Sequence, residues 1–246
     1  MTDPLLVVIL LTFLVAGLVK GVIGLGLPAI AVGLLSLAMT PAEAAALLVV
    51  PSLATNIWQL AAGPSFSALA RRLLPMMLGV CLGTWAGSGL LTGAGAAEAS
   101  IALGVALLAY AGLGLTRLRL SVPPAWERPL APAIGIATGL VTAATGVFVI
   151  PAVPYLQALG LGKDDLVQAL GLSFTVSTVA MAASLAHEGA FGGTDATLSL
   201  LALVPALGGM ALGQWLRGRI SPEMFRRCFF LGLLALGAHL ALRGVV

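Results

Sequence analysis

Residues 20–28 read KGVIGLGLP and follow directly on an apolar run at 5–18. A lysine, three glycines and a proline therefore stand where a membrane-spanning helix would be expected to continue. Glycine and proline disfavour a helix interior, and a lysine within a bilayer costs about 2.5 to 3.5 kcal/mol on insertion scales. This stretch predicts a helix that is interrupted inside the membrane, at a position with a function.

The composition is that of a membrane protein. Of the 246 residues, 60% are hydrophobic and 9% are charged, whereas about 25% of residues are charged in soluble domains. The runs at 5–18 and 98–115 have the length of helices and lack the alternation of barrel strands. We therefore predict an all-α polytopic membrane protein, multi-pass in the cell (plasma or inner) membrane, with the lipid bilayer around it and no nucleic-acid partner.

The chain contains an internal repeat. GLVKGVIG at 17–24 recurs as GLVTAATG at 139–146, and Pro28 and Pro151 follow the two copies. A second motif, PMMLGVCLGTW, recurs as PALGGMALGQW, so that a proline, two glycines and a tryptophan keep their spacing. These matches predict a single membrane domain with the following parts: 1–246 for the whole domain, 1–116 for the first repeat, 117–129 for a cytoplasmic linker and 130–246 for the second repeat.

Each half divides into five apolar pieces, of which the first two are short. At 1.5 Å per residue, pieces of about 13 to 16 residues cover about 20 to 24 Å, less than the roughly 30 Å of a bilayer core. Both halves are therefore expected to start with short, broken helices, either half-helices or steep hairpins. The pieces are 5–20, 27–39, 43–62, 73–91 and 98–115, then 130–145, 147–160, 165–186, 197–216 and 224–242.

The basic residues predict that the second half is inverted relative to the first. Arg71 and Arg72 lie between the third and fourth pieces of the first half, whereas the matching loop of the second half has no Lys or Arg. With an odd number of crossings per half, ten of the twelve basic residues reach one face, which the positive-inside rule makes cytoplasmic. They are Arg71, Arg72, Arg117, Arg119, Arg128, Lys163, Arg217, Arg219, Arg226 and Arg227. Inverted-topology repeats with interrupted helices are typical of secondary transporters.

The two interruptions suit an anion. A helix that starts inside the membrane leaves N–H groups without partners, and an anion can occupy that place. Pro28 and Pro151 suit the first turn of a helix, and Gly24, Gly26 and Gly146 let the backbone approach a ligand closely. Both helix starts are expected to face the same ligand near the midplane.

A polar stripe lies behind the first interruption. Four polar side chains of the third piece recur at i, i+3, i+4 and i+7, on one helical face; they are Ser52, Thr55, Asn56 and Gln59. The matching piece of the second half has Ser173, Thr175, Ser177 and Thr178. Hydrogen bonding between helices, at about 0.6 kcal/mol per contact, is the alternative role for such residues.

Two further alternatives concern Lys20 and the glycines. Lys20, matched by Thr142 in the second half, either extends to the nearest membrane interface or takes a transported anion as its partner. GLVKG at 17–21 and GIATG at 135–139 are GxxxG patterns, which allow close packing of helices. The glycines therefore serve either packing or an interruption, or both.

The segments GLVKGVIGLGLPAIAVGLLSLAMTPAEAAALLVVPSLATNIWQ and GLVTAATGVFVIPAVPYL make the chain similar to the TauE/SafE family of membrane permeases, also known as the sulfite exporter family. The resemblance covers nearly the whole chain. It implies an anion permease for sulfite and organosulfonates such as sulfoacetate, and it implies no cofactor.

We predict a secondary transporter, a permease or exporter of small oxyanions that works by alternating access. An anion channel and a non-transporting membrane scaffold subunit are the alternatives. The apolar pieces contain no paired carboxylates, metal cluster or nucleophile with a base, so we predict neither an enzyme nor a metal site. The small anion is the expected partner; a Na⁺ or H⁺ coupling ion and a homo-oligomer are left open. The predicted substrate-binding residues are Lys20, Gly24, Gly26, Pro28, Ser52, Thr55, Asn56, Gln59, Thr142, Gly146, Pro151, Thr175, Ser177 and Thr178.

Overall fold

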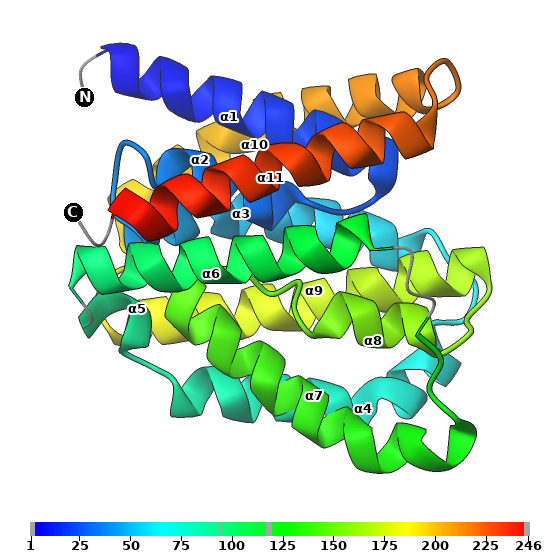
Figure 1. The fold of residues 1–246 in the computed structure, drawn as a ribbon. Helices are drawn as coiled ribbons and strands as arrows, with labels where there is room; N and C mark the ends of the chain where they lie inside the picture. Colours follow the sequence, from blue (N-terminus) through cyan, green and yellow to red (C-terminus); the bar gives the residue numbers. More distant parts are fainter. Residues whose placement is uncertain (1–2, 94, 117–119, 244–246) are drawn as a thin grey trace.

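The computed structural model describes residues 3–93, 95–116 and 120–243, which form a bundle of helices and their connections (Figure 1). Within this part of the chain, seven segments are long and apolar enough to cross a membrane. The all-α polytopic fold is thereby confirmed. The helices that supply these segments are α1 (Asp3–Ile23), α3 (Pro41–Ala61), α4 (Phe66–Ala86), α6 (Ala96–Leu115), α9 (Lys163–His187), α10 (Gly193–Arg217) and α11 (Pro222–Arg243).

The other helices lie in the connections or start with polar residues. They are α2 (Leu27–Leu35), α5 (Leu90–Gly93), α7 (Pro124–Thr145) and α8 (Ala152–Ala158). Helix α7 has 22 residues, but its first turns contain Trp126, Glu127 and Arg128 and are less apolar than those of α1. The last six residues of the predicted linker, 124–129, therefore belong to a helix.

The first piece of each half is longer than the sequence suggested. Helix α1 has 21 residues and α7 has 22, enough for full-length helices, whereas only α2, with nine residues, and α8, with seven, are short. The expectation of half-helices is therefore wrong for the first pieces and holds for the second. Proline at the start of α7 and the burial of Lys20 inside α1 let both helices continue beyond their apolar runs.

The helices pair between the two halves. Helix α1 packs against α10, α4 against α7, α3 against α9 and α6 against α11, and each pair takes one helix from each half (Figure 1). Because α1 matches α7 and α4 matches α10 in the repeat, the first two pairs are the same contact made twice. A two-fold axis between the two halves would produce this pairing of helices. The inverted topology of the repeats stays a prediction.

Glycines bring the members of two of these pairs into backbone contact. A methyl group on any of them would lie 2.1 to 2.5 Å from a carbonyl oxygen of the facing helix, so only glycine fits. The packing role proposed for the GxxxG patterns is therefore confirmed at these positions. They are Gly17 and Gly21 against Gly209 and Gly213 in the α1–α10 pair, and Gly79 and Gly83 against Gly135 and Gly139 in the α4–α7 pair.

One end of the bundle collects most of the basic side chains. There Arg217 of α10 donates to the carbonyl oxygen of Val22 at the end of α1, over 2.7 Å, and Arg226 of α11 donates to that of Gly114 in α6, over 3.3 Å. We call this the basic end. Of the ten residues predicted to share a face, eight fall within the described residues and lie at helix termini on this end, and Arg117 and Arg119 lie outside them.

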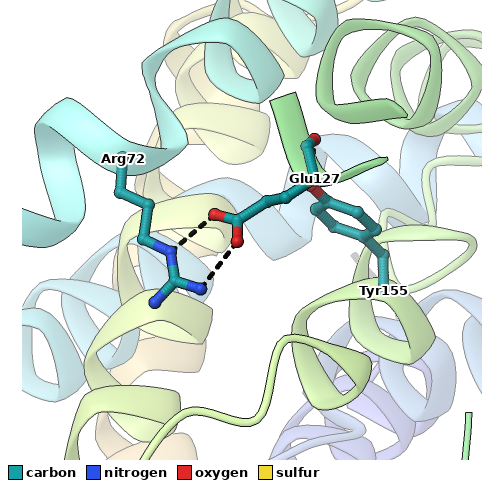
Figure 2. Close-up of polar contacts among 3 residues, drawn as sticks. All are labelled: Arg72, Glu127 and Tyr155. Atoms are coloured by element: carbon teal, nitrogen blue, oxygen red, sulfur yellow. Dashed lines mark hydrogen bonds and ion pairs between the residues drawn. The ribbon is translucent and has the colours of Figure 1, made fainter. Parts of the chain in front are cut away.

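At the basic end an ion pair joins α4 to α7, and a hydrogen bond joins α7 to α8 (Figure 2). Arg72 Nε lies 2.5 Å from Glu127 Oε1, and Arg72 Nη2 lies 2.8 Å from Glu127 Oε2. The Tyr155 hydroxyl donates to the Glu127 carbonyl oxygen over 2.9 Å. Bidentate geometry makes this a stronger contact than an ordinary exposed ion pair, and it fixes the starts of α4 and α7 next to α8.

The two chain termini lie together at the opposite end (Figure 1). There Arg243 of α11 donates to the carbonyl oxygen of Leu37, and Ser88, after α4, donates to the carboxylate of Glu188, after α9, over 2.9 Å. The outer surface presents large apolar side chains, and the exposed Trp58, Trp85 and Trp215 lie in the last turns of α3, α4 and α10. Exposed apolar side chains on long helices are what a surrounding bilayer requires.

Candidate functional site

Lys20 lies inside the bundle. It occupies the last turn of α1, and only 3% of it is exposed. Its ammonium group donates to Thr55 Oγ1 over 3.0 Å and to Asn56 Oδ1. The alternative in which Lys20 extends to a membrane interface is therefore wrong, and its neighbours are two residues of the polar stripe.

The hydrogen bonds around Asn56 have a definite direction. The hydroxyl of Thr178 donates to the carbonyl oxygen of Phe174 over 2.7 Å, so it accepts from Ser52, whose oxygen lies 3.0 Å away. The amide nitrogen of Asn56 donates to Ser52 Oγ at 3.0 Å and to Thr178 Oγ1 at 3.3 Å. The network therefore connects α1, α3 and α9 through buried side chains and ends on a backbone carbonyl.

This network leaves donors unused. Thr55 donates to the carbonyl oxygen of Pro51 over 2.7 Å, so it accepts from Lys20, and two of the three N–H groups of Lys20 are then occupied. In the described part of the chain the buried hydroxyls of Ser173 and Ser177, which precede Thr178 on α9, have no hydrogen-bond partner. Within the described residues, the third N–H of Lys20 is therefore left without a partner, as are these two hydroxyls on α9.

Pro51 explains how α3 keeps the stripe in the bundle interior. Proline removes one helical hydrogen bond and leaves the carbonyl of Leu47, four residues earlier, without its donor. Ser199 of α10 replaces that donor: its hydroxyl donates to Leu47 over 2.8 Å and accepts from the Val50 amide over 2.9 Å. A second helix therefore holds α3 one turn before Ser52.

The first break, residues 24–26 between α1 and α2, borders this network. Gly24 and Gly26 have φ angles of +78° and +97°, which side chains disfavour. Gln59 Nε2 donates to the Gly24 carbonyl oxygen over 2.9 Å, while Gln59 Oε1 is buried and has no partner among the described residues. Pro28 lies in the first turn of α2, as predicted.

Arg217 is a second cation at the first break, a position that its place in the sequence does not predict. Its Nη2 would lie 3.8 Å from a methyl group on Gly24, and its Nε binds the Val22 carbonyl. The sequence assigned Arg217 to a cytoplasmic loop and gave no signal for a contact with a residue 193 positions away. The ion pair between Arg72 and Glu127, the one found among the described residues, involves neither Lys20 nor Arg217.

The second break, residues 146–151 between α7 and α8, is apolar and internally satisfied. Gly146 has a φ of +71°, and the next amide, that of Val147, donates to the Thr145 hydroxyl over 3.1 Å. Phe148 is fully buried and packs on Phe174, with ring centroids 5.4 Å apart. Pro151 caps α8 rather than lying in its first turn. This break has no counterpart of Lys20 or Gln59.

Two predicted threonines of the second half use their hydroxyls within their own helices. Thr142 donates to the Thr138 carbonyl oxygen, and Thr175 donates to that of Gly171, both over 2.7 Å. Neither is joined to the Lys20 network by a hydrogen bond among the described residues. Of the predicted residues, the structure brings together Lys20, Gly24, Ser52, Thr55, Asn56, Gln59 and Thr178 through hydrogen bonds.

The two breaks lie at opposite ends of α3. Gly24 contacts Gln59 near the end of α3, whereas Gly146 would place a methyl group 2.8 Å from Ala45 near its start. The 14 residues between Ala45 and Gln59 correspond to about 21 Å of helix. The expectation that both helix starts face one ligand is therefore not met, because α1 and α7 are full-length helices that bring their breaks to different ends of the bundle.

Comparison with known proteins identifies the family. The chain belongs to the sulfite exporter TauE/SafE family, whose model matches residues 9–240. The comparisons with curated proteins and with solved structures give no match. This is a family of membrane transporters for sulfur-containing anions, so the chain is a multi-pass membrane protein, and the membership fits the prediction that it is not an enzyme.

Proposed function

We propose that this protein is a secondary transporter of small oxyanions, most suitably sulfite or organosulfonates such as sulfoacetate, and that it works by alternating access. The observation behind the proposal is Lys20, a buried amine that is held by neutral groups and has no carboxylate partner in the described part of the chain. A cation in the membrane normally marks a pathway or a partner. The missing partner is the transported anion.

The surroundings of Lys20 suit an oxyanion rather than a cation. The third N–H of Lys20 is a donor, and oxygen atoms bearing negative charge are the strongest acceptors for it. Asn56 and Thr55 hold the amine in place without neutralising its charge. Binding of an anion would balance the positive charge of the protonated Lys20 amine.

The first break and the stripe have distinct parts in this proposal. Gly24 and Gly26 allow the backbone to approach the ligand, and Gln59 fixes the break by binding the carbonyl of Gly24. Arg217 lies beside this break, at the basic end of the bundle, and would attract anions toward the break. Ser52 and Thr178 orient Asn56 from two helices.

The residues of the second half have a smaller part. Thr142, Gly146, Pro151 and Thr175 surround an apolar break that offers no charged donor. Alternating access would open the Lys20 region to the basic end in one state and to the opposite end in the other. We place substrate binding at the first break. The second break then belongs to the part of the structure that closes the binding site.

Purified protein in liposomes tests the function. A transporter should take up sulfite or sulfoacetate with saturable kinetics and show counterflow when the liposomes are preloaded with unlabelled anion. Flux without saturable counterflow would indicate a channel, and no flux with any anion would indicate a scaffold subunit. Cationic amines should not compete; equal competition by an amine and by sulfite would overturn the anion site. Imposed Na⁺ and H⁺ gradients test the coupling ion.

A further inference from the structure

A cavity of about 480 Å³ lies at the basic end, between α6, α8, α11 and the first break. Its volume falls in the range of small-molecule sites, roughly 300 to 1,000 Å³. The cavity lies apart from the hydrogen-bonded network of Lys20, which shares no residue with its lining. Most of the lining is apolar and includes Ile23, Leu25, Leu113, Val153 and Phe230.

Among the lining residues that the structure describes, one is charged, and it is a cation. Arg226 donates one N–H of its guanidinium to the Gly114 carbonyl and keeps further donors free. Its guanidinium carbon lies 5.9 Å from the ring centroid of Phe230. With no carboxylate among the described residues of the lining, the charge of Arg226 favours an anionic ligand.

A buried hydroxyl in the same cavity has no partner. Tyr110 is 3% exposed, and its hydroxyl makes no hydrogen bond with the residues that the structure describes. Its ring meets the ring of Phe230 edge to face, with centroids 5.2 Å apart. Tyr110 and Arg226 both lie against the ring of Phe230, and an anionic group that reaches the Tyr110 hydroxyl could accept from both residues. A buried donor without an acceptor is unfavourable, so a ligand oxygen there would remove a cost to the empty protein.

Part of the cavity lining is exposed on the outer surface of the bundle. Leu113 and Leu120 belong to its lining and are 42% and 55% exposed, respectively. Helices α6 and α11 pack side by side, and Val105 and Leu231 also present exposed apolar side chains on them (Figure 1). On membrane-spanning helices such as α6 and α11, exposed apolar residues face acyl chains, whereas Leu120 lies in the connection between α6 and α7. A ligand that combines an anionic head with an apolar tail fits both parts of the cavity.

We propose that this cavity binds an anionic phospholipid of the adjoining leaflet, with its phosphate against Arg226 and Tyr110 and an acyl chain along the apolar lining. Basic pockets between transmembrane helices are known to hold anionic lipid headgroups. A small inorganic oxyanion would leave the apolar lining without contacts. The lipid site is independent of the proposed transport function.

Lipid binding to the full chain in detergent tests the proposal. The delipidated protein is titrated with phosphatidylglycerol and, separately, with phosphatidylcholine, and bound lipid is counted by native mass spectrometry. Phosphatidylglycerol should bind at one site and about tenfold more tightly than phosphatidylcholine. Arg226→Gln should weaken phosphatidylglycerol about tenfold, and Tyr110→Phe, which removes only the hydroxyl, about threefold.

The neighbouring residue provides the control. Arg227→Gln removes the same charge from α11 at a position outside the cavity lining, and it should change the affinity by less than about twofold. An equal loss in both arginine variants would mean that surface charge alone attracts the lipid and would overturn the site. Equal binding of the two lipids would overturn it too. Displacement of phosphatidylglycerol by sodium oleate at the same concentration would show that the occupant is a free amphiphile, not a phospholipid.

Discussion

The first and second breaks have related sequences and different chemistry. At the first break, Gln59 binds the Gly24 carbonyl and the cations Lys20 and Arg217 lie close by. At the second, Thr145 satisfies the backbone and Phe148 fills the space between helices. The first break is therefore polar and charged, whereas the second is closed by apolar packing.

The glycine packing recurs in the two parts of the chain, whereas the polar groups at the breaks do not. The glycine contacts of α1 with α10 recur between α4 and α7 at nearly the same distances. At matching positions of the stripe, however, Asn56 corresponds to Thr178 and Gln59 to Met181. Of the two similar halves, only the first has the charged group, Lys20. Thr142 stands at the matching position of the second half.

The largest expected effect tests the shared packing. Gly83→Val in the first half and Gly213→Val in the second should each lower the free energy of unfolding by more than about 3 kcal/mol, because the new side chain meets a facing carbonyl oxygen. Thermal unfolding in detergent measures both. Gly208→Val is the control, since nothing lies within 4 Å of a methyl group there. A loss of stability in only one of these two variants would show that the two glycine contacts are not equivalent.

Removal of the charge tests the chemical difference. Lys20→Met should weaken anion binding by about 10- to 100-fold, equivalent to the roughly 1.5 to 3 kcal/mol of a hydrogen bond to a charged group. The unfolding temperature should not fall, because a buried cation without its ligand is unfavourable. Thr142→Val, at the matching position, should change affinity by less than about twofold, because its hydroxyl is satisfied within α7. Titration calorimetry measures the anion affinity of both variants. Equal losses of affinity would show that both breaks bind the anion.

Substitutions of Asn56 on α3 and of Thr178 on α9 compare how much each helix contributes to anion binding. Asn56→Leu keeps the volume and removes the acceptor of Lys20, which should weaken anion binding by about 1 to 3 kcal/mol. Thr178→Val removes one acceptor of Asn56 and should have a smaller effect, about 0.5 to 1.5 kcal/mol. Flux and affinity are measured on monodisperse protein. If the Asn56 variant transports at the parental rate and affinity, the stripe only packs helices.

The smallest effect concerns Arg217. Because it is exposed, Arg217→Gln should slow anion uptake only about two- to fivefold at low ionic strength, and salt should remove the difference. Arg243→Gln, at the opposite end of the bundle, removes an equally exposed charge and should have no effect on uptake from the basic end. A salt-independent loss would instead assign Arg217 a direct contact with the anion.

The sequence predicted much of the packing and part of the site. The polar stripe, the interruption after Lys20 and the GxxxG patterns could be found because they depend on local spacing. The contacts of Lys20 with Thr55 and Asn56, and of Arg217 with Val22, could not be predicted. They join residues 35, 36 and 195 positions apart, on different helices, so they depend on which helices pack together.

By itself, the sequence determined that this chain is a helical membrane protein with a repeated, glycine-rich framework, because apolar runs and periodic spacing act within one helix at a time. Only the tertiary structure decided that Lys20 is buried and that the two breaks stand at opposite ends of α3. The lengths of α1 and α7 and their pairing with α10 and α4 set those positions. Helix pairing is a property of surfaces brought together from the whole chain, and no local pattern encodes it.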